Sequence, residues 1–236
     1  MTYPKPSVTV DCVIFRFNEY DGSLLHHGAR GEGRASMQVL LIERGGPPFI
    51  GKWAIPGGFV NIDESLDDAA YRELREETGL KKGVYMEQLY TFGRPKRDPR
   101  GRVIAIAYMA LMRPDVPEVK AGSDARTAEW CDIALARSRR LAFDHNDILF
   151  TAVNRLEAKV HYAPVLFDLV PERFTMAELQ RVYETIVHSE VDARHFRRKV
   201  EKLGVLDVAG TKETGHRPAT LYTFNRNRYE PDDFHL

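Results

Sequence analysis

The stretch GGFVNIDESLDDAAYRELREETGL, residues 57–80, joins two glycines to an acidic segment that carries the signals of a helix. Ser65 is a favoured N-cap residue, and Asp68 follows it at the spacing of a capping box. Residues 66–78 contain neither glycine nor proline, and Gly79 suits the left-handed conformation that commonly ends a helix. The pattern predicts one helix of about four turns.

Three carboxylates gather near the end of this predicted helix. Glu73 precedes Glu76 and Glu77 by three and four residues, so the three lie on neighbouring parts of one helical face. Mutual repulsion and the negative end of the helix dipole disfavour this arrangement unless a cation lies among them. Because the donors are oxygens, with no Cys or His nearby, Mg²⁺ or Mn²⁺ is expected rather than zinc. Arg72 can neutralise part of the cluster through an i,i+4 pair with Glu76.

The spacing of these residues decides between two interpretations of the segment. One is an ordinary solvated acidic helix. The other is a site at which Gly57 and Gly58, lacking Cβ atoms, let the backbone approach a metal or phosphate closely. The segment matches the pattern G-x5-E-x7-R-E-U-x-E-E-x-G-U, where U is apolar, at every fixed position, and by this match the chain resembles the Nudix hydrolase family. The matching residues are Gly58, Glu64, Arg72, Glu73, Leu74, Glu76, Glu77, Gly79 and Leu80.

The resemblance implies a fold and a reaction. The fold is an α/β/α sandwich, of the α/β (α+β) class, with the signature forming a loop, a helix and a loop. The reaction is hydrolysis of the pyrophosphate in a nucleoside diphosphate linked to another group, with divalent ions that neutralise the phosphates and lower the pKa of water. Carried over by position, Glu73 and Glu77 would be direct metal ligands, and Gly57 would be a ligand through its carbonyl. Glu76 would be either a metal ligand or a residue that orients water, and Arg72 and Glu64 would support the ligands. The catalytic set would be Glu64, Arg72, Glu76 and Glu77.

Other parts of the chain offer weaker candidates for the same site. The general base varies in this family, and Asp124 and Glu129 are candidates, although each could be an ordinary surface acid. The arginine-rich segment 94–102 lies between two predicted strands, where its cations either are solvated or contact phosphates or a partner subunit. His145 is interpreted as a structural residue. The predicted substrate-binding residues are Gly58, Arg97 and Arg100.

Alternating apolar and β-branched residues predict the strands around the acidic helix, at 7–17, 37–42, 85–92, 103–112 and 129–133. One helix among several strands indicates a mixed sandwich over roughly the first 140 residues. The chain has 236 residues and zero formal net charge, which gives no overall indication of a nucleic-acid or membrane partner. Cys12 and Cys131 are expected to be reduced core residues, and without a leader or a spanning segment the protein is expected in the cytoplasm.

The sequence pattern changes after about Leu141. Helical spacing predicts a helix from 145 to 159, a second that begins at Thr175 with a capping box to Glu178, and a third that follows Asp192 and ends near Gly204. Two short strand-like runs follow, VLDVA and ATLYTF, joined by a polar loop. Helix, turn, helix and a two-stranded wing is the layout of a winged helix-turn-helix.

The charge of this region favours DNA over the alternative of a small interaction domain with a solvated basic face. Residues 194–217 contain seven Lys or Arg and three acids, in a chain whose total charge is zero. Such cations on a presented helix and wing can neutralise DNA phosphates, and polar side chains near the helix start can reach base edges. The predicted DNA-binding residues are Arg194, His195, Arg197, Arg198, Lys199, Lys212 and Arg217.

Phrases of this region, FTMAELQRVYETI, DARHFRRKV and RPATLY, resemble the C-terminal domain of Nudix-related transcriptional regulators of NAD metabolism. TFGRPKRDPRGRVIAIAY and LAFDHNDIL extend the likeness over nearly the whole chain. It implies a homodimer that binds a palindromic double-stranded DNA operator and responds to ADP-ribose or a related compound. His195 stands where many relatives are expected to have asparagine, which bears on base recognition.

The sequence therefore predicts a Nudix domain over 1–143, a connecting helix over 144–162 and a winged helix-turn-helix over 163–236. The predicted function is a Nudix pyrophosphohydrolase that cleaves ADP-ribose to AMP and ribose 5-phosphate, fused to a DNA-binding domain that makes it a candidate transcriptional regulator. The alternative is a repressor without catalysis, whose Nudix domain senses ADP-ribose or a sugar-derived effector. No membrane partner is expected.

Overall fold

The computed structural model describes residues 5–19, 35–79, 84–114, 125–213, 217–231 and 236. The chain forms two compact units. The first comprises residues 1–15, 38–111 and 117–155, and the second comprises residues 16–37, 112–116 and 156–236. The division between residues 155 and 156 falls inside helix α3 (His145–Lys159), for which the sequence predicted a helix over 145–159.

The first unit is built on a seven-stranded sheet. Its main path runs in the order β3-β2-β1-β6-β5, with β4 paired to β1 and β7 paired to β2. All five predicted strands are present, and β5 and β6 have the predicted bounds. The sequence did not predict β3 and β4, which are two and three residues long. The strands are β1 (Ser7–Asn18), β2 (Ser36–Arg44), β3 (Trp53–Ala54), β4 (Gly57–Phe59), β5 (Tyr85–Phe92), β6 (Val103–Met112) and β7 (Ala125–Asp132).

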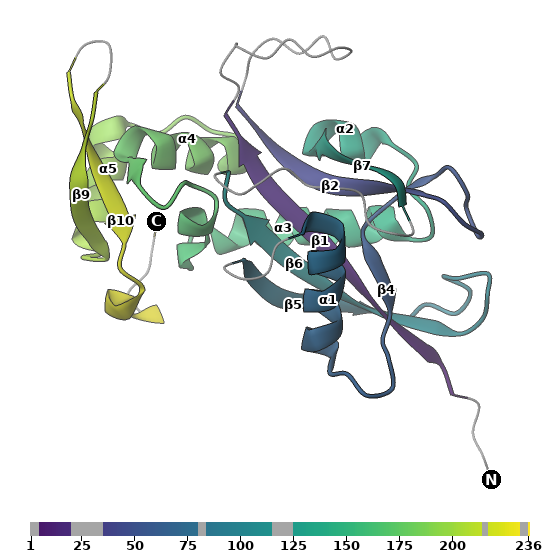
Figure 1. The fold of residues 1–236 in the computed structure, drawn as a ribbon. Coiled ribbons are helices and arrows are strands. Elements are labelled where there is room, and N and C mark those ends of the chain that lie inside the picture. The colour runs from purple at the N-terminus through teal and green to yellow at the C-terminus, as the bar shows by residue number, and fades with distance from the viewer. Residues whose placement is uncertain (1–4, 20–34, 80–83, 115–124, 214–216, 232–235) are drawn as a thin grey trace. The chain divides into compact units, whose positions relative to one another are not determined.

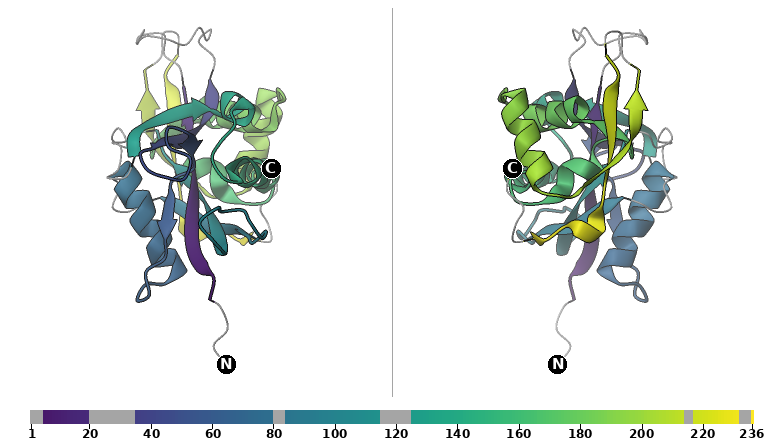
Figure 2. Two further views of the ribbon diagram at one scale, coloured as in Figure 1. Left: turned by 90° about the vertical axis from the view of Figure 1, so that its right-hand side faces the viewer. Right: turned by 90° about the vertical axis from the view of Figure 1, so that its left-hand side faces the viewer.

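Helices cover both faces of this sheet. Helix α1 (Leu66–Thr78) lies on one face and α3 on the other, as Figures 1 and 2 show. A short helix, α2 (Ile133–Ser138), follows β7 and was not predicted. Fully buried side chains such as Ile14, Leu40 and Met109 form the core between the layers. The predicted α/β/α sandwich is confirmed, and Cys12 and Cys131 are buried free thiols.

The second unit contains the predicted helix-turn-helix and wing. Its three-stranded sheet has the order β8-β10-β9, in which β9 and β10 form the wing and β8 pairs with β10. The winged-helix prediction is confirmed, whereas β8 and the two 3₁₀ helices were not predicted. The elements are η1 (Pro164–Asp168), β8 (Phe174–Thr175), α4 (Met176–Val187), α5 (Ala193–Lys202), β9 (Leu206–Lys212), β10 (Ala219–Phe224) and η2 (Arg226–Arg228).

Local capping signals fix both helices of the helix-turn-helix. Helix α4 begins with a complete capping box, in which Thr175 and Glu178 each accept a backbone N–H of the other. Asp192 caps α5 by accepting the backbone N–H of His195 at 2.8 Å. Gly204, with φ 68°, follows the end of α5 in the left-handed conformation. These contacts are local, which is why the sequence predicted both helices closely.

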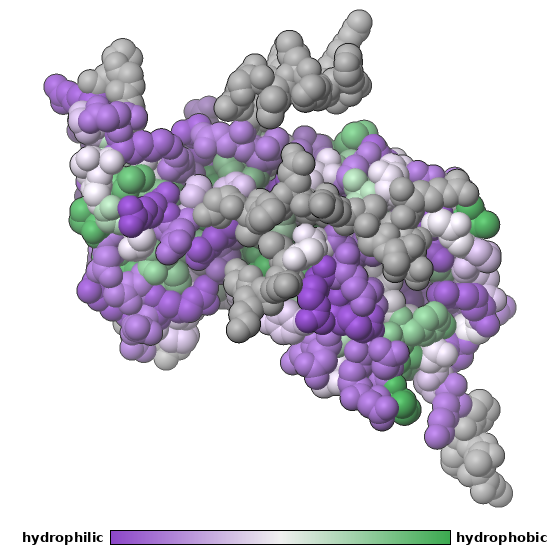
Figure 3. Space-filling view, viewed as in Figure 1, coloured by the Kyte–Doolittle hydropathy of each residue, from purple (hydrophilic) through white to green (hydrophobic). Residues whose placement is uncertain are grey.

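The face drawn in Figure 3 is mostly hydrophilic, with apolar residues in scattered small groups. Scattered apolar side chains of this kind are ordinary on folded proteins. Across the described ranges, no helix has both the length and the apolar character needed to cross a membrane.

Candidate active site

Helix α1 presents the acidic residues of the Nudix-like signature. Ser65 caps it by accepting the backbone N–H of Asp68 at 3.1 Å, and Gly79 ends it with φ 71°, as predicted. Two of its carboxylates are on the inner side of the helix, because Glu73 and Glu77 are each 6% exposed. The side chain of Glu76 is about half exposed, at 48%.

The guanidinium of Arg72 joins this helix to the segment before it. Its Nη1 donates to Glu73 Oε1 at 2.6 Å, and its Nε and Nη2 donate to the two carboxylate oxygens of Glu64 at 3.1 and 2.7 Å. Nη2 also donates to the carbonyl of Phe59 at 3.1 Å, and Nη1 lies 3.7 Å from Glu76. Hydrogen bonds from Arg72 lower the pKa of Glu64 to about 2, so this carboxylate is ionised at neutral pH.

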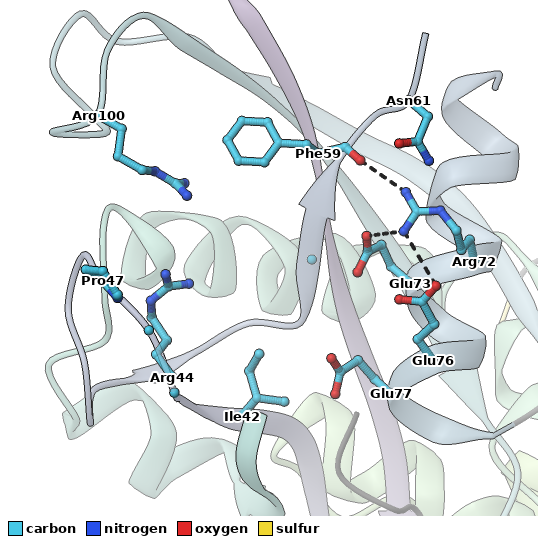
Figure 4. Close-up of a pocket in the computed structure, with 13 residues that line it drawn as sticks. Ile42, Arg44, Pro47, Phe59, Asn61, Arg72, Glu73, Glu76, Glu77 and Arg100 are labelled. Atoms are coloured by element: carbon cyan, nitrogen blue, oxygen red, sulfur yellow. Dashed lines mark hydrogen bonds and ion pairs between the residues drawn. The ribbon is translucent and has the colours of Figure 1, made fainter. Parts of the chain in front are cut away.

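The signature residues face a cavity of about 800 Å³ (Figure 4). Three carboxylates and Arg72 lie on one side of it, and Gly57 also lines it. Arg44 and Arg100 lie on the opposite side and extend toward the space between the two groups, as Figure 4 shows. The lining residues are Ile42, Arg44, Gly45, Gly46, Pro47, Gly57, Phe59, Asn61, Arg72, Glu73, Glu76, Glu77 and Arg100.

Gly57 and Gly58, the adjacent glycines at the start of the stretch 57–80, are both required by close contacts within the protein. A Cβ atom on Gly58 would lie 2.1 Å from Glu73 Oε1, and a Cβ atom on Gly57 would lie 2.3 Å from the carbonyl oxygen of Val10. Gly57 pairs with Asp11 in the β1–β4 ladder, which brings the two strands into this contact. The sequence suggested that the glycines admit a ligand. The structure shows that they first admit the Glu73 carboxylate and strand β1.

The donor set on the acidic side suits a hard divalent cation. Glu73, Glu76, Glu77 and the Gly57 backbone offer oxygen atoms, which Mg²⁺ and Mn²⁺ prefer. Burial raises the pKa of Glu73, although hydrogen bonds from Arg72 act in the opposite direction. A buried carboxylate whose charge is disfavoured by its surroundings is stabilised by a nearby cation. The chemistry of these oxygen donors therefore fits the predicted ion.

Arg72 already supplies one cation to these carboxylates. Its Nη1 lies between Glu73 and Glu76, so part of the repulsion expected from the sequence is relieved within the protein. Among the residues that the structure describes, no group of three or more Asp, Glu, His or Cys side chains is arranged to hold a metal ion. The three acids thus share one cavity without forming a closed cage.

Two predicted substrate-binding arginines of the 94–102 loop have different surroundings. Arg100 lines the cavity, where its guanidinium donates to the buried carboxylate of Asp98 at 2.7 and 3.0 Å. The side chain of Arg97 is 4% exposed and pairs with Asp144 at 2.5 Å and with Asp11 at 3.4 Å. Arg97 is therefore a counter-ion for Asp11 on β1 and for Asp144, which directly precedes α3, and it is not among the residues that line the cavity.

His145 belongs to the same buried cluster. Its Nδ1 accepts the backbone N–H of Ile55 at 2.9 Å, and its Nε2 lies 4.0 Å from Asp11. Burial lowers the pKa of His145 to about 3, so the ring is neutral at physiological pH. These contacts give it the structural surroundings that the sequence analysis expected.

Of the two candidates for the general base, only Glu129 is among the described residues, and it does not line the cavity. Asp124 lies outside the described residues. Glu129, on β7, pairs with Arg139. Sequence reasoning also missed several lining residues, including Arg44, Asn61 and Phe59. A usable signal existed for Arg44, a cation at the end of a predicted strand and directly before the Pro/Gly-rich connector.

The predicted DNA-binding residues are exposed on α5 and the wing, while Phe196 and Val200 are buried beneath α5. Arg197 donates to Glu201 at 2.8 Å and to the hydroxyl of Tyr222 at 3.2 Å, which connects α5 to β10. Lys212 pairs with Glu178 at 2.7 Å. The exposed predicted residues are Arg194, His195, Arg197, Arg198, Lys199, Lys212 and Arg217.

Comparison with known proteins agrees with both units. Residues 29–152 match the NUDIX domain. The ADPR responsive transcriptional repressor NtrR of Acinetobacter baylyi is 35% identical over 231 residues, which cover 97% of this chain and 86% of that protein. The chain belongs to the Nudix family. Residues 166–224 match the NrtR DNA-binding winged helix domain, so this Nudix protein carries a C-terminal winged helix of the NrtR type.

Two further relatives of this Nudix protein match it over different lengths. The crystal structure of Shewanella oneidensis NrtR complexed with a 27mer DNA has a TM-score of 0.76 and 32% identity, and the match covers 96% of this chain and 94% of that one. The ADP-ribose pyrophosphatase of Methanocaldococcus jannaschii is 39% identical over 149 residues, or 62% of this chain and 73% of that protein. Its match is thus shorter than that of the whole-length regulators.

The contact between Gly58 and Glu73 predicts the effect of a single methyl group. Gly58→Ala would displace the Glu73 carboxylate, because the new Cβ would lie 2.1 Å from Oε1. We expect Mn²⁺ affinity to fall by about 10–100-fold, as it does when the support of a metal ligand is lost. Water-proton relaxation during a Mn²⁺ titration measures this affinity.

Gly46→Ala is the matched control for that experiment. Gly46 lines the same cavity, but a Cβ atom there would meet nothing within 4 Å. Its Mn²⁺ affinity should equal that of the unmodified protein. Equal Mn²⁺ affinities for Gly58→Ala and Gly46→Ala would show that the position of Glu73 does not govern metal binding.

Proposed function

We propose that this Nudix protein hydrolyses ADP-ribose to AMP and ribose 5-phosphate in the cavity beside α1, and that its winged helix makes it a ligand-responsive transcriptional regulator of NAD-related genes. One observation carries the proposal: Glu73, Glu76, Glu77 and Gly57 line one cavity in a chain that also has a winged helix. The names of the M. jannaschii and A. baylyi relatives support ADP-ribose as the ligand.

The proposed cofactor is Mg²⁺ or Mn²⁺, held by Glu73, Glu76, Glu77 and the Gly57 carbonyl. When bound, such an ion supplies neutralisation of phosphate charge and a lowered pKa for water. The protein's own contribution is to hold these oxygen atoms in place before the ligand arrives. Glu64 fixes Arg72, and Arg72 in turn fixes Glu73 through Nη1. Pre-positioned groups of this kind do not have to reorganise during the reaction.

The proposed DNA partner is a double-stranded operator. Arg194, Arg198 and Lys199 would contact phosphates or base edges from α5, and Lys212 and Arg217 would do so from the wing. A homodimer with two winged helices would match a palindromic operator, because a two-fold symmetric protein presents its recognition helices as a symmetric pair. The domain boundaries at residues 143 and 162 and the cytoplasmic location form part of this proposal.

A second candidate function is ligand sensing without hydrolysis. It is favoured by the name of the A. baylyi relative, which is a repressor. ADP-ribose or a sugar-derived effector would then change DNA affinity by binding two conformations unequally. The two functions differ in one observable, the formation of AMP.

Hydrolysis is expected to depend on Glu77, a buried carboxylate that lines the cavity. With ADP-ribose and Mg²⁺, we expect AMP to form, and Glu77→Gln to lower kcat by at least about 100-fold, because a neutral amide binds a divalent ion poorly. Chromatography of the products measures AMP. Asp132→Asn, at an exposed acid of the same unit, should keep the full rate. AMP formation no faster than with Glu77→Gln would leave only the sensing function.

DNA binding is expected to depend on the exposed cations of α5. The double change Arg194→Ala and Arg198→Ala should weaken binding to the DNA upstream of the protein's own gene. It should also make the slope of log K against log salt less steep by about two, one for each phosphate contact that is lost. Gel shifts at several salt concentrations measure both effects. Arg228→Ala, at an exposed arginine of η2 that pairs with Asp207, is the control. Unchanged affinity and slope in the double variant would contradict the assignment of α5.

A further inference from the structure

Two phenylalanines of the first unit have a backbone conformation that bulky residues rarely adopt. Phe143 has φ 51° and Phe49 has φ 65°. Their rings contact each other edge to face, with centroids 4.9 Å apart. Positive φ in a residue of this size costs free energy and persists only where surrounding contacts require it, often at functional sites.

The ring of Phe143 lies beneath two arginines of the cavity. The guanidinium carbon of Arg44 is 4.9 Å from its centroid, and that of Arg100 is 5.5 Å away. Arg100 also lies 4.9 Å from the ring of Phe59, which lines the cavity and is 45% exposed. Arg44, Phe143, Arg100 and Phe59 thus form a continuous contact series, which we term the arginine–phenylalanine wall. Each contact is within the range of a cation–π interaction.

Each arginine of this wall has a second contact that sets its direction. Arg44 Nε donates to the carbonyl of Pro48 at 2.8 Å. Arg100 donates through Nε and Nη2 to Asp98, a residue only 3% exposed. A side chain that is already ordered loses little conformational entropy on binding, so these contacts prepare the guanidiniums for a ligand.

The wall faces the acidic side of the cavity. Figure 4 shows Arg44 and Arg100 on one side and Glu73, Glu76 and Glu77 on the other, with the cavity between them. Cations and carboxylates held apart on opposite walls suit a ligand whose anionic groups can contact the arginines directly and the carboxylates through divalent cations. Guanidinium groups bind phosphoryl oxygens through paired hydrogen bonds.

We propose that Arg44 and Arg100 bind the diphosphate of the ligand, and that Phe143 is the positioning residue that holds their guanidiniums side by side. This inference rests on the proposed function, because it assumes a nucleoside diphosphate derivative as the ligand. It assigns phosphate binding to two arginines that are 56 residues apart in sequence and to one strained aromatic residue that touches both. Phe143 need not touch the ligand itself.

The test uses the full chain, Mg²⁺ and the α,β-methylene analogue of ADP-ribose, which cannot be hydrolysed at the bridging position. Titration calorimetry gives its Kd, and AMP, with one phosphate, serves as the comparison ligand. Arg44→Met and Arg100→Met should each raise the Kd of the analogue by about 10–100-fold, which corresponds to the loss of charge-assisted hydrogen bonds. The Kd of AMP should rise less. Arg94→Met, at an 81% exposed arginine of the same loop that does not line the cavity, should change neither value.

Phe143 is tested by a pair of variants that differ in the ring. Phe143→Leu should raise the Kd of the analogue by at least about fivefold, and Phe143→Tyr should restore it to within about twofold, since tyrosine keeps the cation–π surface. If Phe143→Leu is unstable, Arg44→Met and Arg100→Met still test diphosphate binding by the arginine–phenylalanine wall. Failure of the unmodified protein to bind the analogue would overturn the proposed function together with this inference. If the unmodified protein binds the analogue and both Arg44→Met and Arg100→Met have the same Kd for it, the inference alone would be overturned.

Discussion

The guanidinium of Arg72 is the contact on which the arrangement of the site depends. It binds Glu64, Glu73 and the carbonyl of Phe59 at the same time, and so ties together helix α1, the loop before it and strand β4. Without Arg72, each of these three partners would keep its reduced solvation but lose a hydrogen-bond donor. Removal of this shared donor is therefore expected to lower the free energy of unfolding. A surface pair such as Arg197 with Glu201, in which both side chains are about half exposed, contributes far less.

The same contact explains how a helix tolerates clustered acids. The sequence indicates that Glu73, Glu76 and Glu77 need a nearby positive charge. Arg72, on the same helix, provides part of that charge. Burial still raises the pKa of Glu73, and Gly58 leaves its carboxylate the space that a side chain would fill. The carboxylates on the acidic side of the cavity are thus held where their negative charge is destabilised in the absence of a further cation. A cation that binds there stabilises that charge. The opposing arginine–phenylalanine wall gives the cavity a charge asymmetry suited to an anionic ligand that also interacts with divalent ions.

Local signals made much of the fold predictable from the sequence. Caps and stop residues placed α1, α4 and α5, because their hydrogen bonds join residues a few positions apart. The acidic side of the site was predictable for the same reason, since its residues stand on one helix at a fixed spacing. The arginine side was not, because it depends on contacts between distant parts of the chain. Arg97 and Arg100 share one loop, and the sequence could not show that Asp11 and Asp144 would draw Arg97 inward while Arg100 stayed at the cavity.

The most direct test of this account is the affinity for Mn²⁺, measured by electron paramagnetic resonance, after Arg72→Met. Simple electrostatics predicts tighter binding, because a positive charge beside the carboxylates has been removed. If Arg72 positions the carboxylates on the acidic side of the cavity, the Mn²⁺ affinity should instead fall by about 10–100-fold, as it does when groups that orient metal ligands are lost. Arg75→Met, at an exposed arginine of the same helix, removes the same charge without these contacts. Mn²⁺ binding that is equal or tighter in Arg72→Met than in Arg75→Met would contradict the account.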